Sequence, residues 1–335
     1  MPRRTPTKRV TSADVAREAG VSRATVSFVL NETPGQTIPE ATRRRVLEAA
    51  RTLRYQPSAA ARTLRSGRSE IVLFLMPNWS TSEVVAKSMD AMSAAFSERG
   101  MAFLVHPRAT SNRHLSDLWR SITPALVITV GELDPHERAT LDIAGVAHLG
   151  LDIGDTGQAL GAHQLAIGRS QAEHLVRLGH TRLGYATTSD ASLSVFAEPR
   201  LLGAQQVCAE HGLPAPLSLS AEPGAQAAQS LRAWRSAGVT AIAAYNDDVA
   251  LALLQAARAS EITVPDDLSV IGADDITAAE LAFPPLTTIR SDPSALAPAL
   301  VAMVLARLDG RPSDHLPHLP GGELILRDST RTRAE

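Results

Sequence analysis

Residues 20–31, GVSRATVSFVLN, place hydroxyl side chains, one arginine and one phenylalanine within about three helical turns. Hydroxyl and guanidinium groups bind phosphate oxygens and base edges, so this stretch has the chemistry of a nucleic-acid contact. At 100° per residue, Ala24 and Phe28 lie opposite the apolar stripe of the helix. That stripe has three members: Val26, Val29 and Leu30. Phe28 is therefore predicted to lie outside the core, on the face that meets the ligand.

The elements that must position this face are two short helices. Thr11 followed by Asp14 is a capping box that begins a first helix, and Gly20 ends it. Ser22 caps a second helix after a tight turn. Helix, tight turn and helix are the geometry of a helix-turn-helix motif.

Two further segments follow the motif. A third helix is predicted over residues 39–55. Its predicted inner stripe consists of Val46, Leu47, Ala50 and Leu53. The next stretch runs from Pro57 to Gly67, is alanine-rich and basic, and carries one large apolar residue, Leu64. Because about eight residues are too few for a stable isolated helix, this stretch is predicted to fold only against a partner.

Charge separates the beginning of the chain from the remainder. Residues 1–68 carry 14 arginine and lysine residues against 5 acidic residues, a net charge of +9. The whole chain of 335 residues has a net charge of -2, which leaves -11 for the rest. A basic head on an acidic body is typical of a nucleic-acid binder with a separate second function.

From residue 69 onward, short apolar runs alternate with helical segments. The first runs are residues 71–77, 102–107, 125–131 and 146–152, and the second are 182–188, 239–247, 268–275 and 286–290. Continuous apolar strands separated by helices indicate parallel sheets covered on both faces. Two series predict two lobes, over about 69–160 and 161–290. A ligand is expected beyond the carboxyl ends of the strands, in the cleft between the lobes.

Polar residues at strand ends are the candidates for contacting such a ligand. Asp152, Asn246 and Asp274 each follow an apolar run, and Arg200 lies near the start of a helix after a strand and loop. Asp247 is predicted instead to cap the helix that it opens.

Several stretches resemble the lac repressor/gal repressor family of bacterial transcription regulators. In the head they are residues 10–31 and 42–69, and in the body they are RLLG, YND, VIGADD, PPLTTIR and GGELILRDST. The resemblance implies an all-α helix-turn-helix domain over 1–56 and a hinge helix over 57–68. It also implies a two-lobed α/β domain over 69–335, like that of periplasmic sugar-binding proteins, with C-terminal crossovers. A homodimer on a pseudo-palindromic operator is expected.

The resemblance also implies roles for individual residues. Base edges are expected to meet Arg23, Ala24 and Phe28, and phosphates to meet Thr11, Ser22, Thr25, Ser27 and Asn31. The minor-groove hinge is expected to use Ala61, Arg62, Leu64 and Arg65, with Leu64 inserted as a pair. The effector, a sugar or related metabolite, is expected to contact Trp79, Asp152, Phe196, Arg200, Asn246 and Asp274. Trp79 is a candidate stacking platform, with Phe196 and Phe283 as lesser candidates, although aromatic residues make up only 4% of the chain.

Phe28 departs from the family pattern. Many relatives carry arginine there, which can bond bidentately to guanine, and phenylalanine cannot. Ala24 and Phe28, four residues apart, form a small apolar patch, and the apolar feature of the major groove is the thymine methyl. The sequence therefore predicts a thymine, or a tolerated base, where relatives require guanine.

The remaining features favour a ligand-responsive repressor over two rivals. No signal peptide or run of about 18 apolar residues is present, which predicts a cytoplasmic protein rather than a secreted solute-binding protein. The single cysteine, Cys208, permits no intrachain disulfide. An enzyme would need a nucleophile and base beside Asp274 and Asp275, and none is apparent. No cofactor is expected, and no metal is expected at His315 and His318, which lie in a proline-rich loop.

Overall fold

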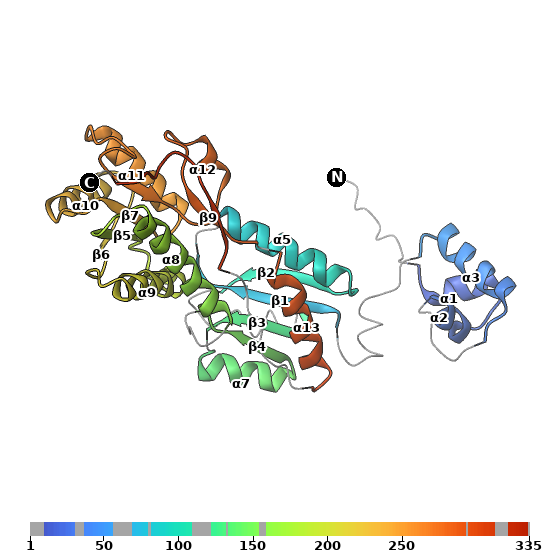
Figure 1. Ribbon diagram of the computed structural model, residues 1–335. Helices are drawn as coiled ribbons and strands as arrows, with labels where there is room; N and C mark the ends of the chain where they lie inside the picture. The colour runs from blue at the N-terminus through green and yellow to red at the C-terminus, as the bar shows by residue number, and fades with distance from the viewer. Residues whose placement is uncertain are drawn as a thin grey trace, which may run out of the picture. The chain divides into compact units, whose positions relative to one another are not determined.

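The computed structural model describes residues 10–30, 37–55, 69–79, 82–108, 122–131, 133–153, 159–292, 294–311 and 321–333. The expectations for Asn31, for the hinge over 57–68 with Ala61, Arg62, Leu64 and Arg65, and for His315 and His318 lie outside these residues. The chain divides into two compact units, Met1–Ser69 and Glu70–Glu335 (Figure 1).

The first unit contains three helices, α1 (Ser12–Ala19), α2 (Arg23–Leu30) and α3 (Glu40–Thr52). The Asp14 carboxylate accepts a hydrogen bond of 3.0 Å from the Thr11 backbone N–H. Gly20 ends α1 at φ 64°, in the left-handed region that glycine occupies without a steric penalty. Ser22 Oγ accepts from the Thr25 N–H at 3.1 Å. The predicted helix-turn-helix is confirmed.

The core of this unit confirms the placement of Phe28 and corrects that of Leu47. Val15, Val26 and Val46 are fully buried in one cluster, of which Phe28, half-buried, is not a member. Leu47 was predicted to be internal and is 48% exposed. The inner stripe of α3 is Val46, Ala49, Ala50 and Leu53. These follow the i, i+3, i+4, i+7 pattern of a helix face, from which Leu47 is rotated by about 100°.

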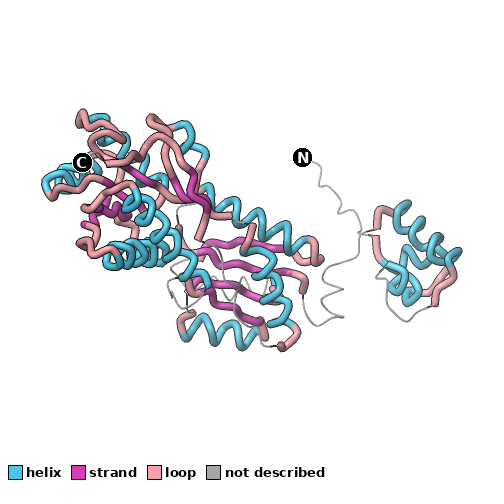
Figure 2. Tube along the Cα trace, in the orientation of Figure 1, coloured by secondary structure: helices cyan, strands magenta, loops and turns pink. Residues whose placement is uncertain are grey.

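The first lobe of the second unit is a four-stranded parallel sheet in the order β2-β1-β3-β4. Its elements are β1 (Ile71–Met76), α5 (Glu83–Ser97), β2 (Ala102–Pro107), β3 (Leu126–Val130), α7 (Pro135–Ala144) and β4 (Ala147–Leu151). All five residues of β3 are buried, as expected for a central strand covered on both faces. The helices and strands of this lobe are distinguished by colour in Figure 2.

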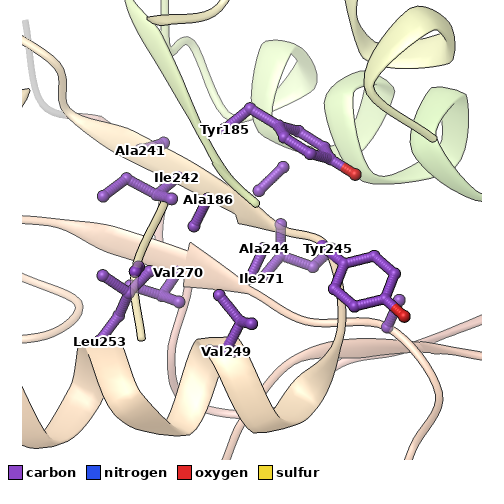
Figure 3. Close-up of a cluster of buried hydrophobic side chains, with 14 of the residues drawn as sticks. Tyr185, Ala186, Ala241, Ile242, Ala244, Tyr245, Val249, Leu253, Val270 and Ile271 are labelled. Carbon is purple, nitrogen blue, oxygen red and sulfur yellow. The ribbon is translucent and has the colours of Figure 1, made fainter. Parts of the chain in front are cut away.

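The second lobe repeats the arrangement in the order β6-β5-β7-β8, also parallel. Its elements are α8 (Ala159–Arg177), β5 (Leu183–Thr187), the 3-10 helix η2 (Ala191–Leu193), α9 (Ser194–Glu210), β6 (Leu217–Ser220), α10 (Ala225–Ser236), β7 (Ala241–Ala244), α11 (Asp247–Ala259), β8 (Ser269–Ile271) and α12 (Thr277–Leu281). Side chains of β5, β7, β8 and α11 pack together in its core (Figure 3). Strand β6 was not predicted, because an edge strand with alternating serine lacks a continuous apolar run.

The last strands form a separate two-stranded sheet, in which β9 (Thr288–Arg290) pairs antiparallel with β10 (Glu323–Ile325). The expectation that residues 286–290 join the parallel series is confirmed only at Thr287, which makes an isolated parallel bridge with Ile271 of β8. Helix α13 (Leu296–Leu308) returns to the first lobe, where it buries Leu300, Val301 and Val304 in the core.

Helices α8 and α9 cross at two glycines. A Cβ on Gly168 would lie 1.8 Å from the Arg200 carbonyl oxygen, and one on Gly203 would lie 2.1 Å from the Leu165 carbonyl oxygen. Only glycine permits backbones to approach this closely. The crossing therefore fixes the backbone of Arg200 against α8.

Asp247 joins three elements of the second lobe. Its fully buried carboxylate accepts hydrogen bonds from the Thr288 hydroxyl at 2.6 Å and the Ile276 N–H at 2.9 Å. The expectation that Asp247 caps α11 is wrong, because Asn246 Oδ1 accepts the capping bond from the Val249 N–H at 2.9 Å. Burial raises the pKa of Asp247 to about 8, with smaller raising contributions from Asp274 and Asp275 opposed by the two hydrogen bonds.

Replacement of Gly168 by alanine is expected to lower the free energy of unfolding by about 3 kcal/mol, since the added methyl overlaps a backbone carbonyl that cannot move alone. Gly150→Ala is the matched control, because its Cβ would meet its nearest atoms at 3.5 and 3.6 Å, ordinary contact distances. Urea unfolding of both variants measures the difference. Equal losses in the two variants would contradict the assigned crossing.

Stability is expected to fall as the pH rises toward about 8. A carboxyl whose folded pKa lies above its ordinary value of 3.8 stabilises the folded state fully below 3.8, and that contribution is lost as the pH rises through the folded pKa of about 8. Asp247→Asn removes the titration and is expected to flatten the fall between about pH 4 and 8. Melting temperatures across this range measure both slopes, and a variant with the unchanged slope would show that another group titrates.

Candidate functional sites

The exposed face of α2 brings together the side chains expected to meet DNA. Arg23 and Ala24 are exposed, and Phe28 is half-buried on the same helix. Ser22 and Thr25 are joined at the helix N-terminus, with 2.9 Å between their hydroxyl oxygens. The N-terminus of a helix carries a partial positive charge and free backbone N–H groups, so together with nearby hydroxyl groups it favours the binding of phosphate oxygens.

Thr11 is engaged within its own helix cap. Its hydroxyl donates to Asp14 Oδ2 at 2.7 Å, and its backbone N–H donates to the same oxygen. Arg17 also pairs with Asp14, at 3.3 Å. A phosphate contact through Thr11 would therefore use a group that already has a partner. Ser27 is half-buried on α2.

The second unit contains a cavity of about 200 Å³ walled by both lobes. Four of the six residues expected to contact an effector line it: Trp79, Phe196, Arg200 and Asp274. They come from the loop after β1, from α9 and from the loop after β8. The carboxyl ends of the parallel strands place them there, as the general rule for such sheets requires.

Arg200 is nearly buried in the cavity wall, at 6% exposed, and makes three hydrogen bonds. Its Nε donates to Gln164 Oε1 at 2.8 Å, Nη1 donates to the Tyr245 carbonyl oxygen at 2.6 Å, and Nη2 donates to Asp274 Oδ1 at 3.1 Å. The guanidinium carbon lies 5.3 Å from the centre of the Tyr245 ring. Arg200 thus ties α8, the end of β7 and the loop after β8 to α9.

Asp274 and Asp275 point to different partners. Burial raises the pKa of Asp274, and the Arg200 guanidinium opposes that rise. Asp275 is paired with Arg290 at 2.7 Å and with Arg327 at 2.6 Å. Both aspartates have a positive φ, 106° and 50°, which is uncommon for residues other than glycine. Because each carboxylate is bound to arginine, the two do not form an acid–base pair.

Trp79 links the two lobes at the cavity. Its indole N–H donates to the Ser192 carbonyl oxygen at 2.9 Å. Its ring lies edge-on to that of Phe196, with 4.9 Å between ring centres and an interplanar angle of 63°. The predicted stacking platform therefore already contacts an aromatic ring of the second lobe.

A second link between the lobes joins α5 to α12. The Glu83 carboxylate accepts from the Thr277 N–H at 2.9 Å and from its hydroxyl at 3.0 Å. Lys87 lies 2.6 Å from the same carboxylate. Hydrogen bonds from Lys87 and Thr277 lower the pKa of Glu83 to about 2, so the link is charged at neutral pH.

Asp152, Asn246 and Phe283 are not among the described residues that line the cavity, although Asp152 lies between the lining residues Leu151 and Ile153. Asn246 Oδ1 caps α11, and Phe283 is 83% exposed. Lining residues that the sequence did not reveal come from α5, from α13 and from the segment between β9 and α13. On α5, Val85, Met89 and Met92 repeat at i, i+4 and i+7. This spacing predicts that they share a buried helix face, but it does not predict that this face lines a cavity.

Neither a metal-ligand cluster nor a membrane-spanning helix occurs among the described residues. Among the side chains that the structure describes, no group of three or more His, Cys, Asp and Glu could hold a metal ion. None of the helices within the described ranges has the length and apolar character needed to cross a bilayer.

Known proteins match both units. Residues 11–58 match the model of bacterial regulatory proteins of the lacI family, and residues 172–330 match a periplasmic binding protein-like domain. The HTH-type transcriptional regulator GalR of Escherichia coli K12 is 30% identical, with 96% of each chain covered. The repressor PurR of Photobacterium profundum is 28% identical, over 96% of this chain and 98% of the relative.

A solved structure of the lac repressor dimer bound to operator and the anti-inducer ONPF is 25% identical. It has a TM-score of 0.79 and covers 97% of this chain and all of that chain. The fold class expected from the sequence, helix-turn-helix helices followed by a two-lobed parallel α/β domain, is confirmed. The chain belongs to the lacI family of bacterial regulatory proteins and is a transcriptional regulator of that family.

Proposed function

We propose that the chain represses transcription from operator DNA and that a small-molecule effector in the cavity of the second unit controls its affinity for that DNA. The observation that carries this proposal is the cavity itself, which is walled by both lobes and crossed by the Arg200 network. A ligand there contacts groups whose separation depends on lobe closure. Such a ligand has a different affinity for open and closed forms, which a population shift requires.

The DNA contacts follow from the exposed face of α2. Arg23, Ala24 and Phe28 read base edges in the major groove, while Ser22, Thr25 and Ser27 hold phosphates. Thr11 and Asn31 complete the phosphate contacts. The exposure of Arg23 and Ala24 and the position of Phe28 outside the core support this assignment.

The proposal extends to a hinge and a homodimer. Residues 57–68 form the hinge, in which Leu64 enters the minor groove beside Ala61, Arg62 and Arg65. Leu281 and Phe283, 79% and 83% exposed on the second lobe, supply apolar surface for a two-fold contact. A dimer presents one head to each half of a pseudo-palindromic operator.

Effector control requires that the effector bind the open and closed forms with sizeably different free energies. Moving an equilibrium from 1:99 to 99:1 takes about 5.5 kcal/mol of differential binding. The Glu83–Thr277 and Trp79–Ser192 bonds hold the lobes together and are the contacts that closure makes and opening breaks. The protein acts in the cytoplasm as a binding protein rather than an enzyme, and residues 1–56, 57–68 and 69–335 are its DNA-binding, hinge and effector-binding parts.

The test uses DNA recovered by selection from a random pool with the full chain. The full chain is expected to bind this DNA, and light scattering is expected to give the bound protein the mass of a dimer. Residues 70–335 form a compact unit and are expected not to bind the DNA. Affinity is expected to fall about 10³-fold between 50 and 200 mM salt, because arginine contacts to phosphates release counterions. Binding by residues 70–335 alone, or an affinity independent of salt, would contradict the proposal.

Replacing Phe28 by arginine is expected to change the selected half-site. Arginine can bond to guanine O6 and N7, so the variant should recover guanine where the native chain recovers thymine or several bases, with a preference worth about 1–3 kcal/mol. Leu47→Arg is the matched control, since Leu47 is exposed in the same unit but on another helix. Identical half-sites for the native chain and the Phe28 variant would contradict the base contact.

A further inference from the structure

Among the described residues of the cavity wall, Gln164 is the one with an amide side chain. It lies on α8 and is 8% exposed. Leu160, four residues earlier, lines the same wall, because residues four apart share a helix face. The crossing at Gly168 and Gly203 holds α8 against α9, which brings Gln164 beside Arg200. The position of this amide is therefore set by two packed helices.

The Arg200 side chain fixes which end of the amide faces the cavity. Gln164 Oε1 accepts a hydrogen bond of 2.8 Å from Arg200 Nε. A guanidinium nitrogen can only donate, so the amide atom that faces it must be the oxygen and cannot be the nitrogen. The two N–H groups of Gln164 Nε2 are therefore directed away from Arg200 Nε.

The amide nitrogen has no acceptor among the described residues. The hydrogen bond to Arg200 uses the oxygen of Gln164, and its nitrogen makes none. The described polar side-chain atoms that are both unpaired and closed off from solvent belong to Gln171, Tyr185 and Ser291. Gln164 Nε2 is not one of these, so it is open to the cavity that Gln164 lines. Polar groups on nearly buried side chains rarely lack a partner, and an acceptor on a ligand would supply one.

Arg200 and Asp274 supply further hydrogen-bonding groups to the same part of the cavity. Each terminal nitrogen of Arg200 uses one N–H group in its printed bonds, to the Tyr245 carbonyl and to Asp274 Oδ1, and a second N–H group remains on each. Asp274 Oδ2 has no hydrogen-bond partner among the described residues. A hydroxyl group suits this pair, because it can accept from the guanidinium and donate to the carboxylate.

The amide then requires a second oxygen on the ligand. Gln164 Oε1 and Nε2 are bonded to the same carbon, so the open N–H groups lie close to the guanidinium that binds the first oxygen. Because an amide N–H can only donate, its partner must be an acceptor. The oxygen bound by Gln164 and the hydroxyl bound by Arg200 and Asp274 must be near neighbours, as they are on adjacent carbon atoms.

We propose that Gln164 is a specificity-determining residue, whose amide N–H groups select an effector with an acceptor oxygen next to the hydroxyl that Arg200 and Asp274 bind. Two oxygens on adjacent carbons form a vicinal diol, the pattern of sugars and cyclic polyols. This inference rests on the proposed function in taking the cavity as the effector site. The sequence did not reveal Gln164, because it lies within a helix and not at the end of a strand.

The experiment measures how the full chain binds sugars and their analogues. D-glucose, D-galactose, D-mannose, D-ribose and myo-inositol are first compared by thermal shift, because a ligand that binds only the folded state raises the melting temperature. Calorimetry then compares the compound of largest shift with its deoxy analogues, each lacking one hydroxyl. The analogue without the oxygen bound by Gln164 is expected to bind about tenfold more weakly, since the amide N–H groups lose their acceptor.

Replacement of Gln164 by methionine keeps the length of the side chain and removes the N–H groups. The parent sugar is expected to bind about tenfold more weakly to this variant. The penalty for the one deoxy analogue is expected to disappear, while the penalties for the other analogues remain, because only the lost contact couples the two changes. Gln206→Met is the matched control, since Gln206 on α9 also accepts from an arginine, Arg169, at 3.4 Å and is not among the described lining residues. Melting without ligand confirms that each variant folds.

Replacement of Gln164 by glutamate separates the N–H groups from the bond to Arg200. Glutamate keeps an oxygen that can accept from Arg200 Nε but has no amide N–H. A deoxyfluoro analogue, whose fluorine can accept but not donate, is expected to bind the native chain better than the deoxy analogue does. The glutamate variant is expected to bind these two analogues equally.

The outcomes separate the inference from the proposed function. A penalty that Gln164→Met removes at one oxygen alone supports the inference. Equal weakening of every analogue, unchanged affinity, a fluorine preference kept in Gln164→Glu, or no thermal shift with any of these compounds overturns it. Affinity for the selected DNA is measured in the same samples. A sugar that binds through Gln164 but leaves the DNA affinity unaltered contradicts effector control while the inference stands. A sugar that alters the DNA affinity without depending on Gln164 overturns the inference while the proposed function stands.

Discussion

The effector-binding unit depends on the guanidinium of Arg200. A buried cation is tolerated only when it is paired and hydrogen-bonded, and Arg200 meets both conditions through Gln164, the Tyr245 carbonyl and Asp274. These partners come from a helix, a strand end and a loop that are far apart in the sequence. Each partner must be correctly placed for the buried guanidinium to make all three hydrogen bonds. The Arg200 side chain therefore determines how the three elements meet at the carboxyl edge of the second sheet.

The close crossing of α8 and α9 makes this arrangement possible. Gly168 and Gly203 let the two backbones touch, which places Arg200 within reach of Gln164. The same region carries Asp274 in an uncommon positive-φ conformation, held by the bond to Arg200. Local strain of this kind persists where the surroundings fix the conformation, and it is typical of ligand sites.

Sequence reasoning succeeded where the signal is local. Helix caps at Thr11 and Ser22 depend on neighbouring residues, and a helical wheel suffices to place Phe28 outside the core. The same reasoning misplaced Leu47, because apolar character alone does not decide which side of a helix faces inward. The edge strand β6 was missed for a related reason, since a half-exposed strand has no continuous apolar run to detect.

The cavity was predictable only in part. Strand-end reasoning found Asp274, because the carboxyl ends of parallel strands meet at one edge. It did not find Leu296, since its place in the wall depends on α13 crossing back to the first lobe, a tertiary event without a local signature. Asn246 stays a prediction, and the sequence did not reveal that its Oδ1 also caps α11.

The return of α13 to the first lobe has a consequence for biosynthesis. Leu300, Val301 and Val304 belong to the core formed around β1, β3 and β4, although they are translated long after those strands. Until α13 is translated, the apolar side of the first lobe that receives these side chains lacks the cover of this helix. Ser329, which is fully buried and bonds to the Val270 carbonyl oxygen of β8, joins the second lobe later still. Both lobes are therefore completed only by residues near the end of the chain, and apolar surface of each stays exposed on the nascent chain until then.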